Sequence, residues 1–159
     1  MGSRSKIDEA YVAGFLDGDG SLMLQLKKRK DGNIKLRFMA TICFYQDSRH
    51  DKTLEWIRDL FDIGYFSKRN DGMSELRING YKQVATVLKR LSPYLKFKKI
   101  QAKALAEACD ILSRGTIKTL DNKQLKNLVS LMLVIQKENY STKSKKTKEE
   151  LLSVLGLTP

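Results

Sequence analysis

Two stretches near the start of the chain, residues 21–30 and 34–46, alternate apolar and polar side chains. In the first stretch, leucine occupies positions 22, 24 and 26, and the apolar positions of the second stretch run from Ile34 to Phe44. A period of two places alternate side chains on opposite faces of a strand, so each stretch predicts a strand with one apolar face. The Asp-Gly-Asn sequence at residues 31–33 has the chemistry of a tight turn, which predicts a hairpin.

The rest of the chain predicts helices and a second hairpin. The clearest helix covers residues 51–61, where apolar side chains recur every three or four positions. Strands at residues 64–69 and 74–78 flank a second turn sequence at residues 70–72. The other predicted helices cover residues 7–17, 82–91, 99–112, 122–138 and 148–155. This order predicts an α+β fold with an αββαββ core, an antiparallel sheet and C-terminal helices.

Composition narrows the class of protein. With 159 residues and 42% apolar content, the chain can form one domain with a real core, which we assign to residues 6–159. Residues 1–5 resemble an expression remnant. No apolar run has membrane-spanning length, and Cys43 and Cys109 suit a reducing compartment. A single histidine and two cysteines without ligand spacing disfavour a zinc site and a serine–histidine–aspartate centre.

The net charge of +12 indicates a polyanionic partner, with nucleic acid first and an anionic membrane surface second. Cations gather on the two predicted hairpins, whereas acids lie mainly on the helices. Arginines and amides on strands can reach base edges in a major groove, and lysines can engage phosphates. The alternative is an ordinary solvated sheet face. The predicted DNA contacts are Gln25, Lys27, Lys28, Arg29, Lys30, Asn33, Lys35, Arg37, Tyr45, Lys68, Arg69, Asn70 and Arg77.

A lysine-rich segment follows residue 138 and is open to two interpretations. Its lysines, including Lys143 and Lys145, could make a second set of phosphate contacts. They could equally belong to a disordered tail.

The sequence AYVAGFLDGDGS, residues 10–21, puts small residues on one stripe of the first helix. Ala10, Gly14 and Gly18 are spaced by four, and Ala13 is expected to widen the stripe. Glycine within a helix costs about 1 kcal/mol relative to alanine, which favours close approach of another backbone. The alternative is a core helix packed on its own sheet.

Asp17 and Asp19 stand at the C-terminal end of this helix, where the helix dipole disfavours acids. Two carboxylates there invite a cation, and Mg²⁺ fits because it accepts one or two carboxylates together with waters and phosphate oxygens. The Gly18 carbonyl could be a further ligand. One such site is poor alone, so a second copy packed through the small-residue stripe could supply the missing carboxylate.

VAGFLDGDG, residues 12–20, resembles the signature of the LAGLIDADG homing endonucleases, and the predicted element order agrees. With one copy of the motif, the chain is similar to the single-motif, homodimeric algal enzymes. The resemblance implies a homing endonuclease fold with a saddle-shaped sheet over double-stranded DNA. It also implies Mg²⁺-dependent double-strand cleavage of a long pseudo-palindromic site in intron homing, with Mn²⁺ or Ca²⁺ able to substitute in binding. The implied homodimer interface includes Ala10, Ala13, Gly14 and Asp17.

The resemblance also assigns catalytic roles. It makes Asp19 the metal-binding acid, with the Gly18 carbonyl assisting, Gln46 a solvent-organising residue and Lys98 a cation near the scissile phosphate. Relatives often carry an arginine shortly after the Gln46 position, where this chain has His50, with Arg49 as the alternative.

Two rival functions use the same scaffold, an RNA-binding intron maturase and a non-cleaving DNA-binding protein. The presence of Asp19 favours the nuclease. The expected location is intracellular, with the chloroplast or mitochondrion as candidate organelles, and no membrane partner is expected.

Overall fold

The structure is a computed structural model that describes residues 2–28, 36–139 and 145–158. This part of the chain contains six helices and four strands, in the order that the sequence predicts. Their bounds are α1 (Gly2–Asp19), β1 (Gly20–Lys28), β2 (Leu36–Asp47), α2 (Lys52–Phe61), β3 (Tyr65–Lys68), β4 (Met73–Asn79), α3 (Tyr81–Leu91), α4 (Lys99–Ser113), α5 (Asn122–Glu138) and α6 (Lys148–Val154). Short 3₁₀ turns, η1 (Ser48–His50) and η2 (Ser92–Tyr94), follow β2 and α3. The predicted turn at residues 31–33 lies outside the described residues.

α1 begins earlier than the sequence predicts and runs through the segment set aside as an expression remnant. Its first half is anchored to the rest of the chain by a side-chain contact. Glu9 accepts a 2.6 Å hydrogen bond from Nε of Arg90 on α3, and the Arg90 guanidinium lies over the Phe61 ring at 4.5 Å. Ser5 in turn contacts Glu9. These contacts favour continuation of the helix towards the N-terminus.

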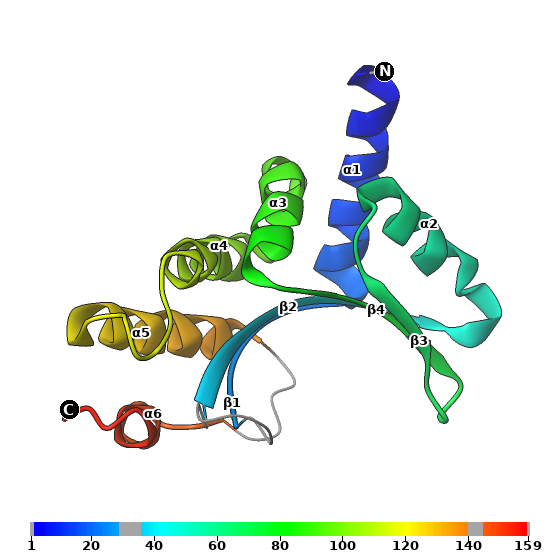
Figure 1. Ribbon diagram of the computed structural model, residues 1–159. Coiled ribbons are helices and arrows are strands. Elements are labelled where there is room, and N and C mark those ends of the chain that lie inside the picture. The colour runs from blue at the N-terminus through cyan, green and yellow to red at the C-terminus, as the bar shows by residue number, and fades with distance from the viewer. Residues whose placement is uncertain (1, 29–35, 140–144, 159) are drawn as a thin grey trace.

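The two hairpins join into one antiparallel sheet with the strand order β1-β2-β4-β3. The sheet is curved, and α1 to α4 pack on one side of it, while α5 runs beside β1 (Figure 1). The other face is left open by the helices that the structure describes. This arrangement confirms the predicted α+β class and the αββαββ core.

The helix-covered face of the sheet is the main core. Leu22 and Leu24 of β1 and Phe38, Ile42 and Phe44 of β2 are buried there, as their alternation predicts. Helix–sheet packing of these side chains buries apolar surface and so stabilises the fold. None of the described helices is long and apolar enough to cross a membrane.

The open face departs from simple alternation at the centre of β2, because Thr41 and Cys43 are also fully buried. β2 lies between β1 and β4, so side chains of both neighbouring strands cover these two small residues. Cys43 stands opposite Ser21 on β1 and Arg77 on β4.

Burial predicts that both free thiols are inert in the native protein. Desolvation raises the pKa of Cys43 to about 11 and that of Cys109 to about 12. At pH 8 the thiolate fraction of Cys43 would then be on the order of a thousandth. We expect native protein to react with a chromogenic disulfide reagent only as it unfolds, and protein in urea to react at once. Rapid titration of a thiol in the native state would contradict this burial.

Candidate functional site

α1, the helix that carries the VAGFLDGDG motif, passes directly into β1, and Asp19 lies at the junction. α1 ends at Asp19 and β1 begins at Gly20 with no intervening loop. A Cβ at Gly20 would lie 2.9 Å from both the Cα and the carbonyl oxygen of Leu16, closer than real Cβ contacts allow. Glycine is therefore required for this sharp exit, which leaves Asp19 exposed at the open end of the helix.

Asp17 explains why the helix ends with acids. Its carboxylate accepts hydrogen bonds from the backbone amides of Lys96 (2.6 Å), Phe97 (3.2 Å) and Lys98 (2.9 Å). These amides precede α4, which starts at Lys99 without a side-chain cap from its own N-cap residue. Asp17 thus takes the place of a capping residue from about eighty residues away in the sequence, and its cost at the end of α1 is offset.

The same contact positions Lys98. The Lys98 side chain is only 9% exposed, and its ammonium donates a 2.5 Å hydrogen bond to the backbone carbonyl of Asp17. Desolvation lowers the pKa of Lys98, while the negative charges of Asp17 and Asp19 act in the opposite direction. The end of α1 therefore holds an acid and a cation beside each other.

Gln101 lies one turn further along α4 and is a residue that sequence reasoning missed. It is 3% exposed, and its amide nitrogen donates to the carbonyl of Glu138 at 3.3 Å. Its Oε1 is buried and has no hydrogen-bond partner among the described residues. An unpaired buried acceptor is costly, so this oxygen is ready to accept a hydrogen bond from a bound water or ligand. No local signal marks this residue in the sequence, because Lys99 and Lys103 flank it and its burial comes from packing beside α5.

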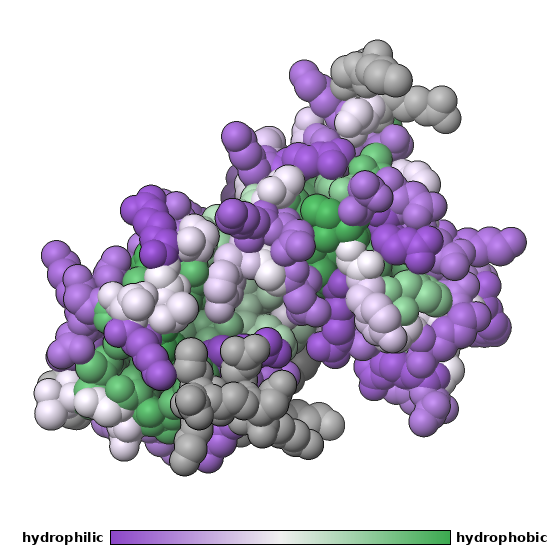
Figure 2. Space-filling view, in the orientation of Figure 1, coloured by the Kyte–Doolittle hydropathy of each residue, from purple (hydrophilic) through white to green (hydrophobic). Residues whose placement is uncertain are grey.

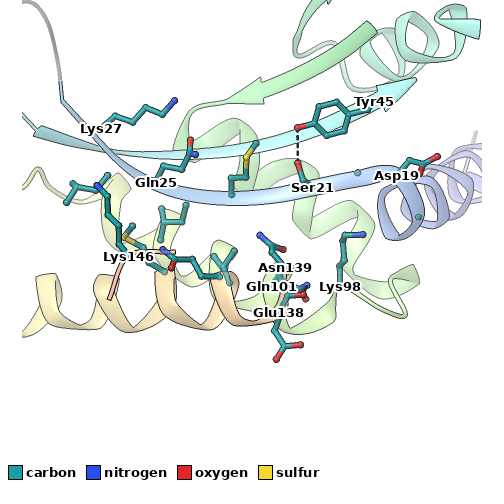
Figure 3. Close-up of a pocket in the computed structure, with 18 residues that line it drawn as sticks. Asp19, Ser21, Gln25, Lys27, Tyr45, Lys98, Gln101, Glu138, Asn139 and Lys146 are labelled. Carbon is teal, nitrogen blue, oxygen red and sulfur yellow. Dashed lines mark hydrogen bonds between the residues drawn. The ribbon is translucent and has the colours of Figure 1, made fainter. Parts of the chain in front are cut away.

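A cavity of about 770 Å³ brings these groups together along the edge of β1 (Figure 3). α5 and the segment before α6 form its other side. The hydroxyls of Ser21 and Tyr45 lie 3.2 Å apart across its upper wall. The predicted site residues that line it are Gly18, Asp19, Gln25, Lys27, Tyr45 and Lys98. Its further polar lining comes from Ser21, Gln101, Gln136, Glu138, Asn139 and Lys146.

The other two predicted catalytic residues lie outside this cavity. Gln46 is half-buried near the end of β2, and its side-chain oxygen accepts a 2.8 Å hydrogen bond from the amide of Asp47. His50 is exposed in η1. The alternative, Arg49, is held by Asp47 through contacts of 3.0 and 2.9 Å, and these hydrogen bonds lower the pKa of Asp47 to about 2. In the single chain, Arg49 is therefore paired with Asp47, and neither Gln46 nor His50 lines the cavity that holds Asp19.

The open face of the sheet carries five of the predicted DNA contacts, Gln25, Lys27, Arg37, Tyr45 and Arg77. Lys27 and Arg37 stand directly opposite each other, both exposed, at one end of the sheet. Arg77 lies near the centre on β4, and hydrophilic side chains also gather over the β3–β4 hairpin, where Arg69 and Asn70 are exposed (Figure 2). Lys28 and Lys145 are exposed. The predicted contacts that lie outside the described residues are Arg29, Lys30, Asn33, Lys35 and Lys143.

Lys68 corrects the predicted contact surface. It stands opposite Ser74 in the sheet, which puts it on the helix-covered side, and its ammonium lies 3.1 Å from the carboxylate of Asp51. Arg77 stands opposite Tyr65, on the open side. The odd spacing between Lys68 and Tyr65 puts their side chains on opposite faces, so Lys68 and Arg77 do not share a surface.

The small-residue stripe of α1 is exposed at Ala10, Gly14 and Gly18. A Cβ at Gly14 or Gly18 would meet nothing within 4 Å. Ala13, which was expected to widen the stripe, is instead fully buried in the chain's own core. Neighbouring helical residues point about 100° apart, so Ala13 and Gly14 face different surroundings.

Exposed apolar side chains flank this stripe. Ile7 and Tyr11 project from α1, and the Tyr11 ring packs edge-on against Trp56 of α2 with centroids 5.8 Å apart. Phe97, beside the Asp17 contact, is 79% exposed. Apolar surface is visible over α1 (Figure 2). This face is thus suited to contact with another apolar surface.

One chain supplies only part of the ligand set that a metal ion needs. Within the described ranges, no group of three or more His, Cys, Asp and Glu side chains is placed to hold a metal ion. Asp19 is the one carboxylate of the predicted metal ligands, and the Gly18 carbonyl lies beside it in the helix end. This donor set is all oxygen and fits a hard cation such as Mg²⁺ if further oxygen ligands are supplied from outside the chain.

Comparison with known proteins gives one consistent family. The sequence model described as LAGLIDADG endonuclease matches residues 12–111. DNA endonuclease I-CvuI from Chlorella vulgaris is 35% identical over 98 residues, which cover 62% of this chain and 61% of that protein. DNA endonuclease I-CreI from Chlamydomonas reinhardtii is 32% identical over 92 residues, which cover 58% of this chain and 56% of that protein. The matched segments span about three fifths of these curated relatives.

The fold agrees over nearly the whole chain. A crystal structure of homing endonuclease I-CvuI with its DNA target and Ca²⁺ has a TM-score of 0.84 at 28% identity, covering 98% of this chain and 99% of that chain. A second I-CvuI structure, with Mg²⁺ and uncleaved DNA, has a TM-score of 0.79 at 27% identity, with the same coverage.

Replacing Asp17 tests its contact with the start of α4. We expect Asp17→Ala to lower the free energy of unfolding by about 2 kcal/mol, because three backbone amides lose their acceptor. The matched control is Asp121→Ala, which removes the cap of α5, where one amide, that of Gln124, donates to Asp121. We expect about 1 kcal/mol there. Urea denaturation at one fixed protein concentration measures both, and an Asp17→Ala protein as stable as the wild type would contradict the assignment.

Proposed function

The chain belongs to the LAGLIDADG endonuclease family, and we propose that it is a homing endonuclease that makes double-strand breaks in a long, pseudo-palindromic DNA site as a homodimer. The observation that carries the proposal is the end of the motif helix. There Asp19 and Lys98 share a cavity with the cationic edge of an open, curved sheet. An acid suited to a divalent ion and a buried cation beside a polyanion-binding surface are the groups that phosphodiester hydrolysis needs.

The open sheet face has the charge expected of a DNA-binding surface. Lys27 and Arg37 are opposite neighbours across two strands, and like charges in such pairs destabilise a sheet. Neither makes an ion pair with a described residue, so a bound phosphate would relieve their repulsion. A curved sheet with side chains on its open face can follow a major groove, which admits a two-stranded ribbon.

The residues of the site fit a divalent metal ion, with Mg²⁺ as the proposed cofactor and Mn²⁺ or Ca²⁺ able to replace it in binding. Asp19 and the Gly18 carbonyl would hold it, and the bound ion would supply Lewis acidity and an activated water. Lys98, held next to this helix end, would stabilise negative charge on the phosphate. Gln101 offers a buried acceptor in the same cavity for ordering a water. Gln46, with His50 or Arg49, stays a prediction for the outer part of the site.

A second copy of the chain would complete the site. The exposed stripe of Ala10, Gly14 and Gly18 lets two α1 helices approach closely, and each would bring one Asp19 to the shared end. The exposed rings of Tyr11 and Phe97 would be covered in the same contact. Two half-sites related by two-fold symmetry match a pseudo-palindromic target.

The maturase and the non-cleaving DNA-binding protein remain the alternative functions, and neither needs Asp19 in the cavity. The proposed location is intracellular, with the chloroplast or mitochondrion as candidate organelles, since the relatives I-CvuI and I-CreI come from green algae. The two buried free thiols fit a reducing compartment.

Asp19→Asn tests the nuclease directly. On a target selected from a randomised duplex library, we expect wild-type cleavage with Mg²⁺ and none with EDTA. Asp19→Asn should cut at least about 100-fold more slowly while its affinity for the DNA stays within about threefold, because only the metal ligand is lost. The control is Asp59→Asn, an exposed acid of α2 that, within the described ranges, pairs with Arg58 alone. Cleavage by Asp19→Asn at the wild-type rate would refute the metal assignment.

Gly14→Leu tests the dimer. A Cβ at Gly14 meets nothing within 4 Å of its own chain, so the variant should fold normally by circular dichroism. In sedimentation equilibrium we expect wild-type dimers and Gly14→Leu monomers, with loss of double-strand cleavage. Thr86→Leu, which adds a leucine at an exposed position on α3, should stay dimeric. A dimeric, active Gly14→Leu protein would rule out close packing of the α1 helices.

A further inference from the structure

One acid on the open face of the sheet is buried among groups that would face DNA. Glu75 of β4 is 8% exposed and lies between Tyr45 of β2 and Ser67 of β3. A carboxylate is unfavourable on a surface that approaches phosphates, and burial makes it more so unless it is paired. Its presence therefore calls for a specific role.

Glu75 holds the guanidinium of Arg77 from one side. One carboxylate oxygen accepts from Nε of Arg77 at 2.7 Å, and the other accepts from Nη2 at 3.3 Å. Ser67 donates to the same carboxylate at 3.4 Å. The Glu75 side chain is 11% exposed and that of Arg77 is 35% exposed, so the contact is shielded while one edge of the arginine still reaches solvent.

This geometry leaves one edge of Arg77 without a partner among the residues that the structure describes. Its Nε–H and one Nη2–H point to Glu75, so the parallel N–H groups of Nη1 and Nη2 form a second edge at the end of the guanidinium. Arg77 lies between Cys43 of β2 and Tyr65 of β3, away from the rim of the sheet. An arginine held in one orientation presents two parallel N–H donors, and Arg77 does so at the centre of the sheet face that would meet the groove. Such a pair of donors matches a planar pair of acceptors, whereas a phosphate contact needs neither the fixed orientation nor the central position.

Guanine offers that acceptor pair. Its O6 and N7 both accept in the major groove, whereas adenine presents a donor beside N7. Resting on the proposed function, we propose that Arg77, oriented by Glu75, is a specificity-determining residue that reads a guanine in each half of the DNA target. Glu75 acts as its positioning residue. Asn79 is exposed two residues further along the same strand, and the buried Thr41 hydroxyl donates to its amide oxygen at 2.7 Å, which orients its side chain.

Arg69 supplies a matched control on the same hairpin. It pairs with Asp71 of the adjacent turn at 2.7 Å, and both side chains are about half exposed, 47% and 50%. An exposed pair at the tip of a hairpin is weakly held and is placed for a phosphate contact. Replacing either arginine by glutamine removes one positive charge, so a difference between the variants reports on base reading.

The experiment selects bound and cleaved sequences from a randomised duplex library with the full-length wild-type, Arg77→Gln, Arg77→Lys, Glu75→Gln and Arg69→Gln proteins. We expect the wild type to require guanine at one symmetric pair of positions. Arg77→Gln should lose this preference by about 5- to 100-fold and keep the others. Arg77→Lys retains the charge without the fork, and Glu75→Gln retains the arginine without its support. Both should relax the same position while overall affinity is maintained.

Arg69→Gln should weaken binding to all sequences equally and reduce the salt dependence of log K by about 0.9. Thermal melting confirms that each protein is folded. Uniform weakening by Arg77→Gln, or a guanine preference unchanged in Arg77→Lys, would overturn the inference and leave the nuclease intact. A wild-type protein that binds DNA without enriching any sequence contradicts both the inference and the proposed function. A loss of base preference that is confined to one base pair in the Arg77 and Glu75 variants supports both of them.

Discussion

The contact between the Asp17 carboxylate and the three backbone amides before α4 is the constraint on which the site depends. It ties the end of the motif helix to a segment far along the chain, so Asp19 and Lys98 are fixed by one set of hydrogen bonds. Gly20 permits the abrupt turn into β1 that leaves Asp19 exposed. Side chains placed on rigid elements in this way are pre-organised, and catalysis by positioned charges depends on such pre-organisation.

The charged and polar side chains of the sheet differ in burial as well as in position. The exposed cations Lys27 and Arg37 lie at one end, where contacts to phosphates are sequence-independent. Towards the centre, buried groups hold their neighbours, as Glu75 holds Arg77 and Thr41 holds Asn79. On a surface of this kind, affinity for DNA comes from exposed cations, whereas sequence specificity comes from donors held in a fixed orientation.

Local patterns predicted the elements well, because strand and helix periods leave direct traces in the sequence. The family signature located Asp19, and resemblance located Lys98. The long-range hydrogen bonds of Asp17 and the buried acceptor of Gln101 had no local signal, since both depend on tertiary packing. The sequence pattern also predicted the wrong face for two residues. Lys68 lies on the helix side because strand faces alternate residue by residue, and Ala13 faces the core because adjacent helical residues diverge by about 100°.

In the proposed homodimer, two copies of α1 meet and bring their Asp19 residues together beside the DNA backbone. Pulsed electron paramagnetic resonance on Asp19→Cys protein carrying a nitroxide label measures this separation most directly, because the native thiols Cys43 and Cys109 are buried. If the α1 helices pack together, a single narrow distance distribution is expected at the short end of the measurable range, in one sample at one concentration. A sample with no coupling between labels, or with a broad distribution of long distances, would contradict this packing.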